Sequence, residues 1–331
     1  MSEDRFQWLE VENQPAPAAA APAGKDQHFY VAEARKAYLE GDYEPALRHY
    51  SESLKHEKAM HESWAGQVRC LVYMHELHEA KTWAEKACNL FPETPLLESC
   101  RARALAACGL VGDALSASDK ALEHAEKAGL ADPHLWLERG ACLLANRQMP
   151  TAQHCFGKAL ELRPNDPDWL QRVLVEWLEG GQPAKALELA NQLVEQRPER
   201  AYAWLLRAQC QRRLGQPKRA EESLTRAEAL RVNWEATSEE RRLMRRSCWI
   251  ATLVFGHEAA PAVLTLRAWR DDCWMGHPLG RALAAGYDRS APAVCQWLLA
   301  YPPLCGLARW TLTRLARRLR SREESHYGKK T

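Results

Sequence analysis

Apolar residues recur at intervals of three and four along most of the chain, and Ala, Leu, Glu, Arg and Gln are the dominant residue types. This period is typical of amphipathic helices, whereas a half-buried strand alternates apolar and polar positions. The pattern therefore predicts an almost entirely helical protein. Near the start, residues 14–24 form a Pro/Ala-rich stretch that predicts an extended linker. Ahead of it, Phe6, Trp8 and Leu9 form a short apolar peptide that we expect to dock on another surface.

A repeat of about 34 residues is the most informative feature of the sequence. Alanines that follow a turn and open a helix recur at spacings of 34, 34, 38, 34 and 34 residues; they are Ala46, Ala80, Ala114, Ala152, Ala186 and Ala220. In most repeats a large residue stands sixteen positions before this alanine and a small one seven positions after it, and three repeats have a proline twelve positions after it. The large residues include Tyr30, Trp64, Trp136 and Trp204, which we expect to hold the stack together. The spacing predicts closely crossing helix pairs that bury their apolar faces by stacking on neighbouring pairs.

This period and these residues resemble the tetratricopeptide repeat family over about 208 residues, 27–234. The resemblance implies an all-α fold: a right-handed α-solenoid of about six helix pairs, followed by a small helical C-terminal domain. It also implies a concave groove, lined by the first helix of each pair, that binds peptides or partner helices. Glu98 departs from the family pattern because it replaces the large apolar residue of the third repeat. Four extra residues at 128–131 predict a lengthened loop.

The family resemblance also points to candidate binding residues on the inner face of the first helices. Arg35, Arg69 and Arg103 each stand eleven positions before an anchor alanine, so they lie in register on neighbouring repeats. Guanidinium groups suit carboxylates or phosphates, so we predict anion contacts there, while a solvated helix face stays open as the alternative. Further groove-binding candidates are His28, Glu62, His134 and Tyr202. A clamp for acidic chaperone tails is disfavoured, because Val31 and Arg35 stand where that clamp has Lys and Asn.

The chain changes character after a charged bridge at 235–247. The run that begins Cys248-Trp249-Ile250-Ala251-Thr252 opens a segment, 248–320, that resembles the bacterial CFI-box C-terminal domain. The resemblance implies a helical domain and a bacterial source, and it brings no biochemical role with it. We therefore expect five parts: an N-terminal peptide with its linker (1–26), the repeats, the bridge, this domain and a tail (321–331).

The end of the C-terminal domain predicts a basic amphipathic helix over 304–320. Residues 301–322 contain six arginines and no acidic residue, beside an apolar stripe that includes Leu312 and Leu315. We expect the stripe to pack inside the domain, with the arginines solvated or facing the acidic repeats. Contact with an anionic membrane surface is the next interpretation. Nucleic-acid binding is the least favoured, because no recognisable reading motif accompanies the arginines.

Composition and charge narrow the function classes. The chain has 331 residues, 46% hydrophobic and 27% charged, which excludes disordered and collagen-like classes. After Glu240 there are 16 basic and 6 acidic residues, so this part carries +10 and the preceding part carries −8. The eleven scattered cysteines form no CxxC pair or metal-spaced cluster, so we predict a reduced, cytoplasmic protein without a metal or cofactor. The acidic start Met1-Ser2-Glu3-Asp4 is unlike a secretory signal.

Enzymatic function has little support in the sequence. It contains no phosphate-binding loop, HExxH or GxSxG motif. The residue types for a cysteine hydrolase exist in Cys248 with His257 or His277 and Asp271, but Cys248 opens an apolar run, which favours a buried structural thiol. We therefore predict a non-enzymatic scaffold or adaptor that binds a protein or peptide partner, with an acidic partner as one option. The hydrolase and a membrane-peripheral assembly factor remain the alternatives.

Overall fold

The computed structural model describes residues 25–246, 249–256, 260–274 and 277–327 of the chain. These residues form an all-α solenoid, and none of the described positions is a strand. The chain divides into two compact units, one up to residue 172 and one from 173 onward. The division falls within one helix, α9 (Pro167–Glu179). The five-part domain division predicted from the sequence stays a prediction.

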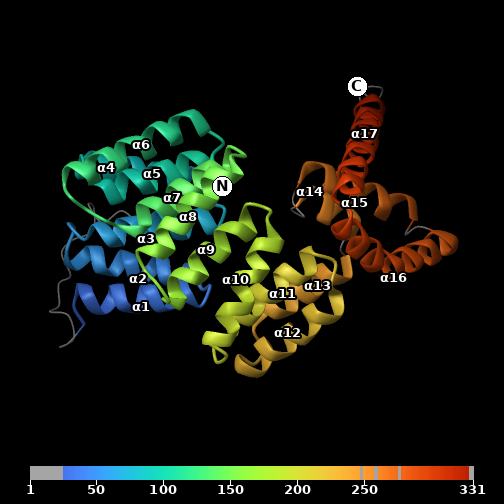
Figure 1. Cartoon of the computed structure of the whole chain (residues 1–331), viewed down its shortest axis with the longest axis horizontal. Helices are drawn as coiled ribbons and strands as arrows, with labels where there is room; N and C mark the ends of the chain where they lie inside the picture. The colour runs from blue at the N-terminus through green and yellow to red at the C-terminus, as the bar shows by residue number, and fades with distance from the viewer. Residues whose placement is uncertain (1–24, 247–248, 257–259, 275–276, 328–331) are drawn as a thin grey trace. The chain divides into compact units, whose positions relative to one another are not determined.

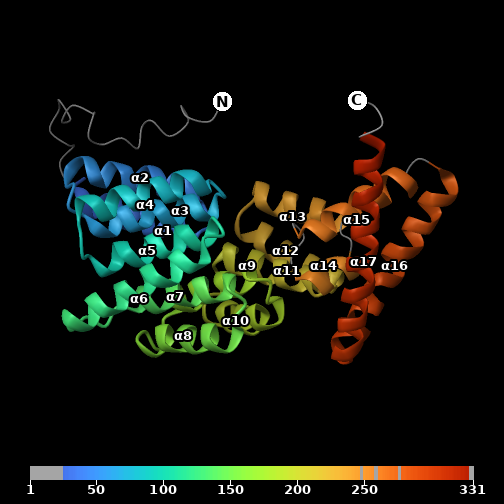
Figure 2. The same ribbon diagram turned by 90° about the horizontal axis from the view of Figure 1, so that it is seen from above.

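The first unit consists of antiparallel helix pairs stacked side by side, as Figures 1 and 2 show for the blue and green part of the chain. Its helices are α1 (Gln27–Leu39), α2 (Tyr43–His56), α3 (His61–Tyr73), α4 (Leu77–Leu90), α5 (Pro95–Ala107), α6 (Val111–Lys127), α7 (Pro133–Ala145) and α8 (Met149–Glu161), followed by the start of α9. Each helix pair corresponds to one 34-residue period, so the sequence repeat is a structural repeat.

The anchor alanines lie where helices approach most closely. All six are fully buried. The residues seven positions later are also buried, including Ala87, Ala121 and Ala159. Larger side chains fill the space between adjacent helices, both within a pair and between pairs: Tyr50 and Phe156 are buried, and a Cβ on Gly66 or Gly140 would overlap their rings. The small residues are therefore required by close packing, as the repeat pattern predicted.

The first helix of each of the six pairs is followed, two positions after its last residue, by a residue with left-handed backbone. These residues stand five positions before the anchor alanines and have φ from 59° to 79°; they are Gly41, His75, Gly109, Arg147, Gly181 and Gly215. Such a residue lets the chain leave the helix while satisfying its last carbonyl groups, and glycine accepts this conformation without strain. His75 and Arg147 carry a Cβ in the same conformation, so two of the six turns are strained.

The third repeat takes up its extra length mainly in its second helix, whereas we predicted a lengthened loop at residues 128–131, which form the turn that follows this helix. Helix α6 has 17 residues, whereas α2 and α4 have 14 each. Glu126 stands where three other repeats have a proline after the helix, and here the helix continues for about one more turn. The helix then ends before Gly129, whose φ is 64°. Glu98, the other departure of this repeat, accepts a 2.8 Å hydrogen bond from His124 of α6.

The first unit closes on itself, because the start of α9 contacts the end of α1. The Gln171 side-chain amide donates a 2.8 Å hydrogen bond to the carbonyl oxygen of Leu39. Beside it, the Arg172 guanidinium lies over the Tyr38 ring, 4.7 Å from its centroid. The end of α1 and the start of α9 therefore meet within the first unit, and the first helices enclose a pocket between them.

The second unit begins with the end of α9 and is also entirely helical where described. Its helices are α10 (Pro183–Gln196), α11 (Ala201–Arg213), α12 (Pro217–Leu230), α13 (Glu235–Arg246), α14 (Trp249–Phe255), α15 (Pro261–Trp274), α16 (Pro278–Ala300) and α17 (Pro302–Tyr327). A buried ion pair, Arg212 with Glu240, ties α11 to α13. The hydroxyl of Tyr287 in α16 accepts a hydrogen bond of 3.2 Å from the backbone N–H of Ile250 in α14.

Helix α17 contains the predicted basic helix and extends it at both ends. Leu312, Ala316 and Leu319 pack against a core with Val263 and Leu266 of α15, which accounts for part of the predicted stripe. Leu307 and Leu315 from the same stripe are exposed, and so is Trp310. The outward face of α17 therefore carries large apolar side chains among its arginines. No described helix is long and apolar enough to cross a membrane.

Candidate functional site

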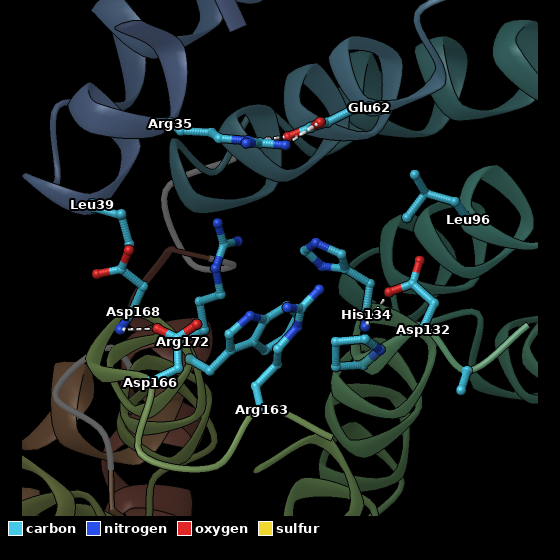
Figure 3. Close-up of a pocket in the computed structure, with 13 residues that line it drawn as sticks. Arg35, Leu39, Glu62, Leu96, Asp132, His134, Arg163, Asp166, Asp168 and Arg172 are labelled. Atoms are coloured by element: carbon cyan, nitrogen blue, oxygen red, sulfur yellow. Dashed lines mark hydrogen bonds and ion pairs between the residues drawn. The ribbon is translucent and has the colours of Figure 1, made fainter. Parts of the chain in front are cut away.

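A pocket of about 480 Å³ lies between the first helices of the repeats in the first unit. Figure 3 shows its side chains converging from α1, α3, α5, α7 and α9 and from the segments that precede α7 and α9. It is lined by Arg35, Leu39, Glu62, Leu96, Ala131, Asp132, Pro133, His134, Arg163, Asp166, Asp168, Trp169 and Arg172. The site therefore combines residues that are up to 137 positions apart in the sequence.

The acidic side chains of the pocket are engaged by neighbouring groups. Glu62 of α3 accepts two hydrogen bonds from the Arg35 guanidinium. Asp132 caps helix α7 by accepting a 2.9 Å hydrogen bond from the backbone N–H of His134. Asp166 caps α9 in the same way, through the backbone N–H of Asp168 at 2.9 Å. These carboxylates therefore stabilise helix ends or neutralise a guanidinium.

Two guanidinium groups of the pocket retain open donors. Among the described residues, the guanidinium groups of Arg163 and Arg172 make no hydrogen bond and no ion pair. Arg172 is instead held by aromatic faces, with its guanidinium carbon 4.7 Å from the Tyr38 ring centroid and 5.4 Å from that of Trp169. Cation–π contacts fix the plane of a guanidinium without consuming its N–H groups. The arrangement can therefore receive an anion on Arg172, with Arg163 contributing a second positive charge.

His134 is the titratable group at the centre of this site. Its ring packs edge-on against Trp169, with centroids 4.6 Å apart. Its Nδ1 atom is buried and has no hydrogen-bond partner among the described residues. Burial, reinforced by the surrounding guanidinium groups of Arg69, Arg172, Arg35 and Arg163, holds the His134 pKa well below its usual value. The imidazole is therefore neutral at physiological pH in the empty pocket.

The three predicted groove arginines differ in their environments. Arg35 is exposed and lines the pocket with Glu62. Arg69 and Arg103 are buried and converge on one carboxylate, Glu138 of α7, at 2.6 and 4.0 Å. Glu138 thus links α3 and α5 to α7 by a shared buried charge, an arrangement that the register of arginines did not predict.

The other predicted groove residues are separated. His134 joins Arg35 and Glu62 in the pocket, whereas His28 is exposed on α1 outside it. Tyr202 lies in the second unit, edge-on to Trp234 with ring centroids 6.2 Å apart. The sequence analysis missed Glu138 and Arg172, which occupy equivalent positions in successive repeats, 34 residues apart. Reading every inner position of the repeat, rather than selected ones, would have found this pair.

The alternative cysteine site falls mostly outside the described part of the chain. Cys248 and His257 lie outside the described residues, as does the side chain of Asp271. The hydrolase alternative and the CFI-box resemblance therefore stay predictions. In the part of the chain that the structure describes, no group of His, Cys, Asp and Glu side chains is arranged to hold a metal ion.

The comparisons with known proteins indicate a repeat protein. Residues 178–236 match a family model described as tetratricopeptide repeat. No curated protein matches the sequence. The structure is similar to the solved structure of YrrB, described as a tetratricopeptide repeat protein with an unusual peptide-binding site. That alignment has 18% identity and a TM-score of 0.35, and it covers 59% of this chain and 98% of YrrB.

Two further solved structures resemble the chain at similar levels. The type IV pilus biogenesis factor PilW shares 18% identity, with 64% of this chain and 97% of PilW covered and a TM-score of 0.41. A thermophilic tetratricopeptide repeat protein of Thermus thermophilus shares 18% identity, with 56% of this chain and 98% of that protein covered and a TM-score of 0.42. The family-model match and the chain's own helix pairs support a protein-interaction scaffold as the general class.

Proposed function

We propose that this protein is a scaffold whose first unit binds an acidic peptide segment of a partner protein in the pocket between the first helices. The proposal is based on a difference between the acidic and the basic side chains of the pocket. Its Glu62, Asp132 and Asp166 carboxylates are engaged, whereas the guanidinium groups of Arg163 and Arg172 have open donors within the described structure. A ligand that supplies acceptors therefore gains more than one that supplies donors.

Within this proposal the predicted groove residues take different parts. Arg35 contacts the peptide from the exposed rim, together with Glu62. Arg69 and Arg103 act indirectly, because their shared pairing with Glu138 fixes α7 and with it His134. His28 and Tyr202 remain candidate contacts for a longer peptide that extends beyond the pocket. The proposal assigns no chemical reaction to the site.

Binding of defined peptides tests the proposal directly. A fluorescent peptide of twelve residues, alternating Glu and Gly, should bind the full-length protein, while the matched Gln/Gly and Lys/Gly peptides should not. Arg172→Gln should weaken binding at least tenfold, because it removes a charged donor pair from a partly desolvated site. Arg226→Gln, on an exposed face of α12, is the control and should leave binding unchanged. Equal binding of the Glu and Lys peptides would reject the proposal.

The outward face of α17 favours membrane contact as a second candidate function. Leu307, Trp310 and Arg314 are exposed on one side of this helix, with Arg317 and Arg318 following at helical spacing. The Arg314 guanidinium lies over the Trp310 ring, 4.1 Å from its centroid. Apolar and aromatic side chains beside arginines suit the boundary between acyl chains and anionic headgroups.

Vesicle sedimentation separates this candidate from internal docking of the helix. The full-length protein should pellet with phosphatidylglycerol vesicles at low salt, and less so at about 0.5 M salt because screening weakens surface electrostatics. Trp310→Glu should abolish pelleting, while Leu264→Glu, at an exposed position of α15, should not. Equal recovery with neutral phosphatidylcholine vesicles, or no recovery with either, would reject membrane contact.

A further inference from the structure

One side chain of the pocket has a buried polar atom whose hydrogen-bonding capacity the described structure does not satisfy. His134 points into the pocket in Figure 3, and its Nδ1 atom is buried without a partner in the described structure. A buried polar atom without a partner is costly, and it needs a structural or functional reason. Protonating this ring would add an N–H at Nδ1 that finds no acceptor, so the empty pocket favours the neutral imidazole.

Charged groups of both signs surround His134 in the pocket. Positive charges approach from α1, α3, α9 and the segment before α9, and negative charges come from α3 and from the segments that cap α7 and α9. The positive groups are Arg35, Arg69, Arg172 and Arg163, and the negative groups are Glu62, Asp132, Asp166 and Asp168. The guanidinium groups prevail at the ring, since burial and these four arginines together lower the His134 pKa.

A ligand carboxylate would change this balance. It would pair with the open donors of Arg172 and would place a negative charge beside the imidazole, which stabilises the protonated ring. The pocket lining carries three arginines and four carboxylates. If the ligand brings one negative charge and His134 takes up one proton, the net charge of the site does not change. A phosphate dianion would add a further negative charge among four carboxylates, and the site therefore favours a monoanion.

We propose that the pocket is a proton-coupled carboxylate site, in which a ligand carboxylate binds Arg172 while His134 takes up one proton from solvent. The inference rests on the proposed function and names the group of the acidic peptide that the pocket recognises. The proton adds to the neutral imidazole and forms imidazolium, and no covalent bond of the ligand changes. Arg172 is the contact residue, and His134 makes the contact depend on pH.

The sign of the pH dependence follows from linkage. The His134 pKa is lower in the empty pocket than in the complex, so binding takes up protons at pH values between the two. Carboxylate affinity therefore rises as pH falls, by at most about tenfold per pH unit for one proton. An ordinary glutamate carboxyl group titrates near pH 4.3, so the ligand itself stays ionised between about pH 6 and 8.

Short peptides test the inference without a protein partner. Acetyl-Gly-Glu-Gly-amide presents a side-chain carboxylate, acetyl-Gly-Gly-Gly with a free C-terminus presents a main-chain carboxylate, and acetyl-Gly-Gln-Gly-amide presents neither. NMR titrations of the full-length protein should show at least threefold tighter binding of a carboxylate peptide at pH 6 than at pH 8. The carboxylate peptide that binds more tightly shows whether the pocket recognises a side-chain or a main-chain carboxylate. The Gln peptide should not bind.

Two variants separate the roles of the residues. His134→Gln should bind the carboxylate peptide with less than twofold change between pH 6 and 8, while Arg172→Gln should lose at least tenfold in affinity at both. Arg226→Gln is again the matched control. Binding by the wild-type protein that is independent of pH, equal binding of the Gln peptide, or tighter binding of inorganic phosphate would overturn the inference.

Failure of the inference and failure of the proposed function give different results. If the twelve-residue Glu/Gly peptide binds through Arg172 but without pH dependence, the scaffold proposal stands and the proton coupling is wrong. If the short carboxylate peptides bind with proton uptake and the long peptide gains nothing over them, the carboxylate site stands and peptide capture is wrong.

Discussion

The side-chain amide of Gln171 donates a 2.8 Å hydrogen bond to the carbonyl oxygen of Leu39, 132 residues away. Leu39 is the last residue of α1, and the final carbonyl groups of a helix have no partner within it. Gln171 therefore satisfies one of these acceptors and at the same time fixes the start of α9 against repeat one. This contact lies beside Leu39 and Arg172, which both line the pocket.

Loss of that contact should open the pocket. We expect Gln171→Ala to lower the free energy of unfolding by about 1 kcal/mol, the usual contribution of one hydrogen bond together with some lost packing. It should also weaken binding of the Glu/Gly peptide, because Arg172 follows directly in the sequence. Urea denaturation and peptide titration measure the two effects. Gln192→Ala, on an exposed face of α10, should change neither.

Close packing in the fourth repeat should make one glycine irreplaceable. A Cβ on Gly140 would lie 2.4 Å from Cε1 of Phe156, a buried ring. We therefore expect Gly140→Ala to destabilise the protein by about 2 kcal/mol through overpacking. Gly157→Ala in the partner helix has no atom within 4 Å of the new Cβ. That control should be neutral or stabilising by up to about 1 kcal/mol, because alanine favours helix. Equal melting temperatures of the two variants would contradict the packing argument.

The strained turn at Arg147 should be relieved by glycine. Arg147 has a φ of 59° and is exposed. Left-handed backbone costs a residue with a Cβ about 1 kcal/mol relative to glycine, so Arg147→Gly should stabilise the protein by roughly that amount. The reverse change at the equivalent turn, Gly109→Ala, meets no atom within 4 Å and should destabilise by a similar amount. Thermal unfolding of both variants checks the prediction, and a shift of the same sign in both would refute it.

The buried charges that meet at Glu138 should respond unequally to mutation. Glu138→Gln leaves the guanidinium groups of Arg69 and Arg103 buried without their carboxylate, so we expect a loss of about 3 kcal/mol. Arg103→Met should cost less, because it leaves the shorter Arg69–Glu138 contact in place. Chemical denaturation of both variants gives the comparison. A larger loss from Arg103→Met would contradict this ranking, because Glu138→Gln disrupts both contacts.

Burial of neutral His134 should make folding stability depend on pH. The His134 pKa is lowered in the folded state from about 6.5 in the unfolded chain, so below pH 6.5 the unfolded state binds more protons. Stability should therefore fall as pH decreases from about 6.5 towards the folded-state pKa, with a slope of up to about 1.4 kcal/mol per pH unit. Urea denaturation between pH 5.5 and 7.5 measures the slope. His134→Gln should remove this contribution, and an unchanged slope would contradict it.

The amino-acid sequence determined the fold class and the packing register of the repeats. The six anchor alanines are all fully buried, and the residues seven positions later are buried as well. These features depend on contacts within a repeat and between neighbours, and such contacts recur with the period of the sequence. The sequence also pointed to Arg35, Glu62 and His134, because inner positions of the first helices face the same side of the stack.

Only the tertiary structure decided which of these residues form a site. The contact between α9 and α1 joins residues that are 132 positions apart, which no single period encodes. The arginines differ in their environments in the folded chain. Arg69 and Arg103 are buried and pair with Glu138, whereas Arg172 lies between aromatic rings with its guanidinium donors open. Pairing of buried charges depends on distances across the fold. Periodicity therefore identified the candidate groups, and the tertiary packing decided their partners.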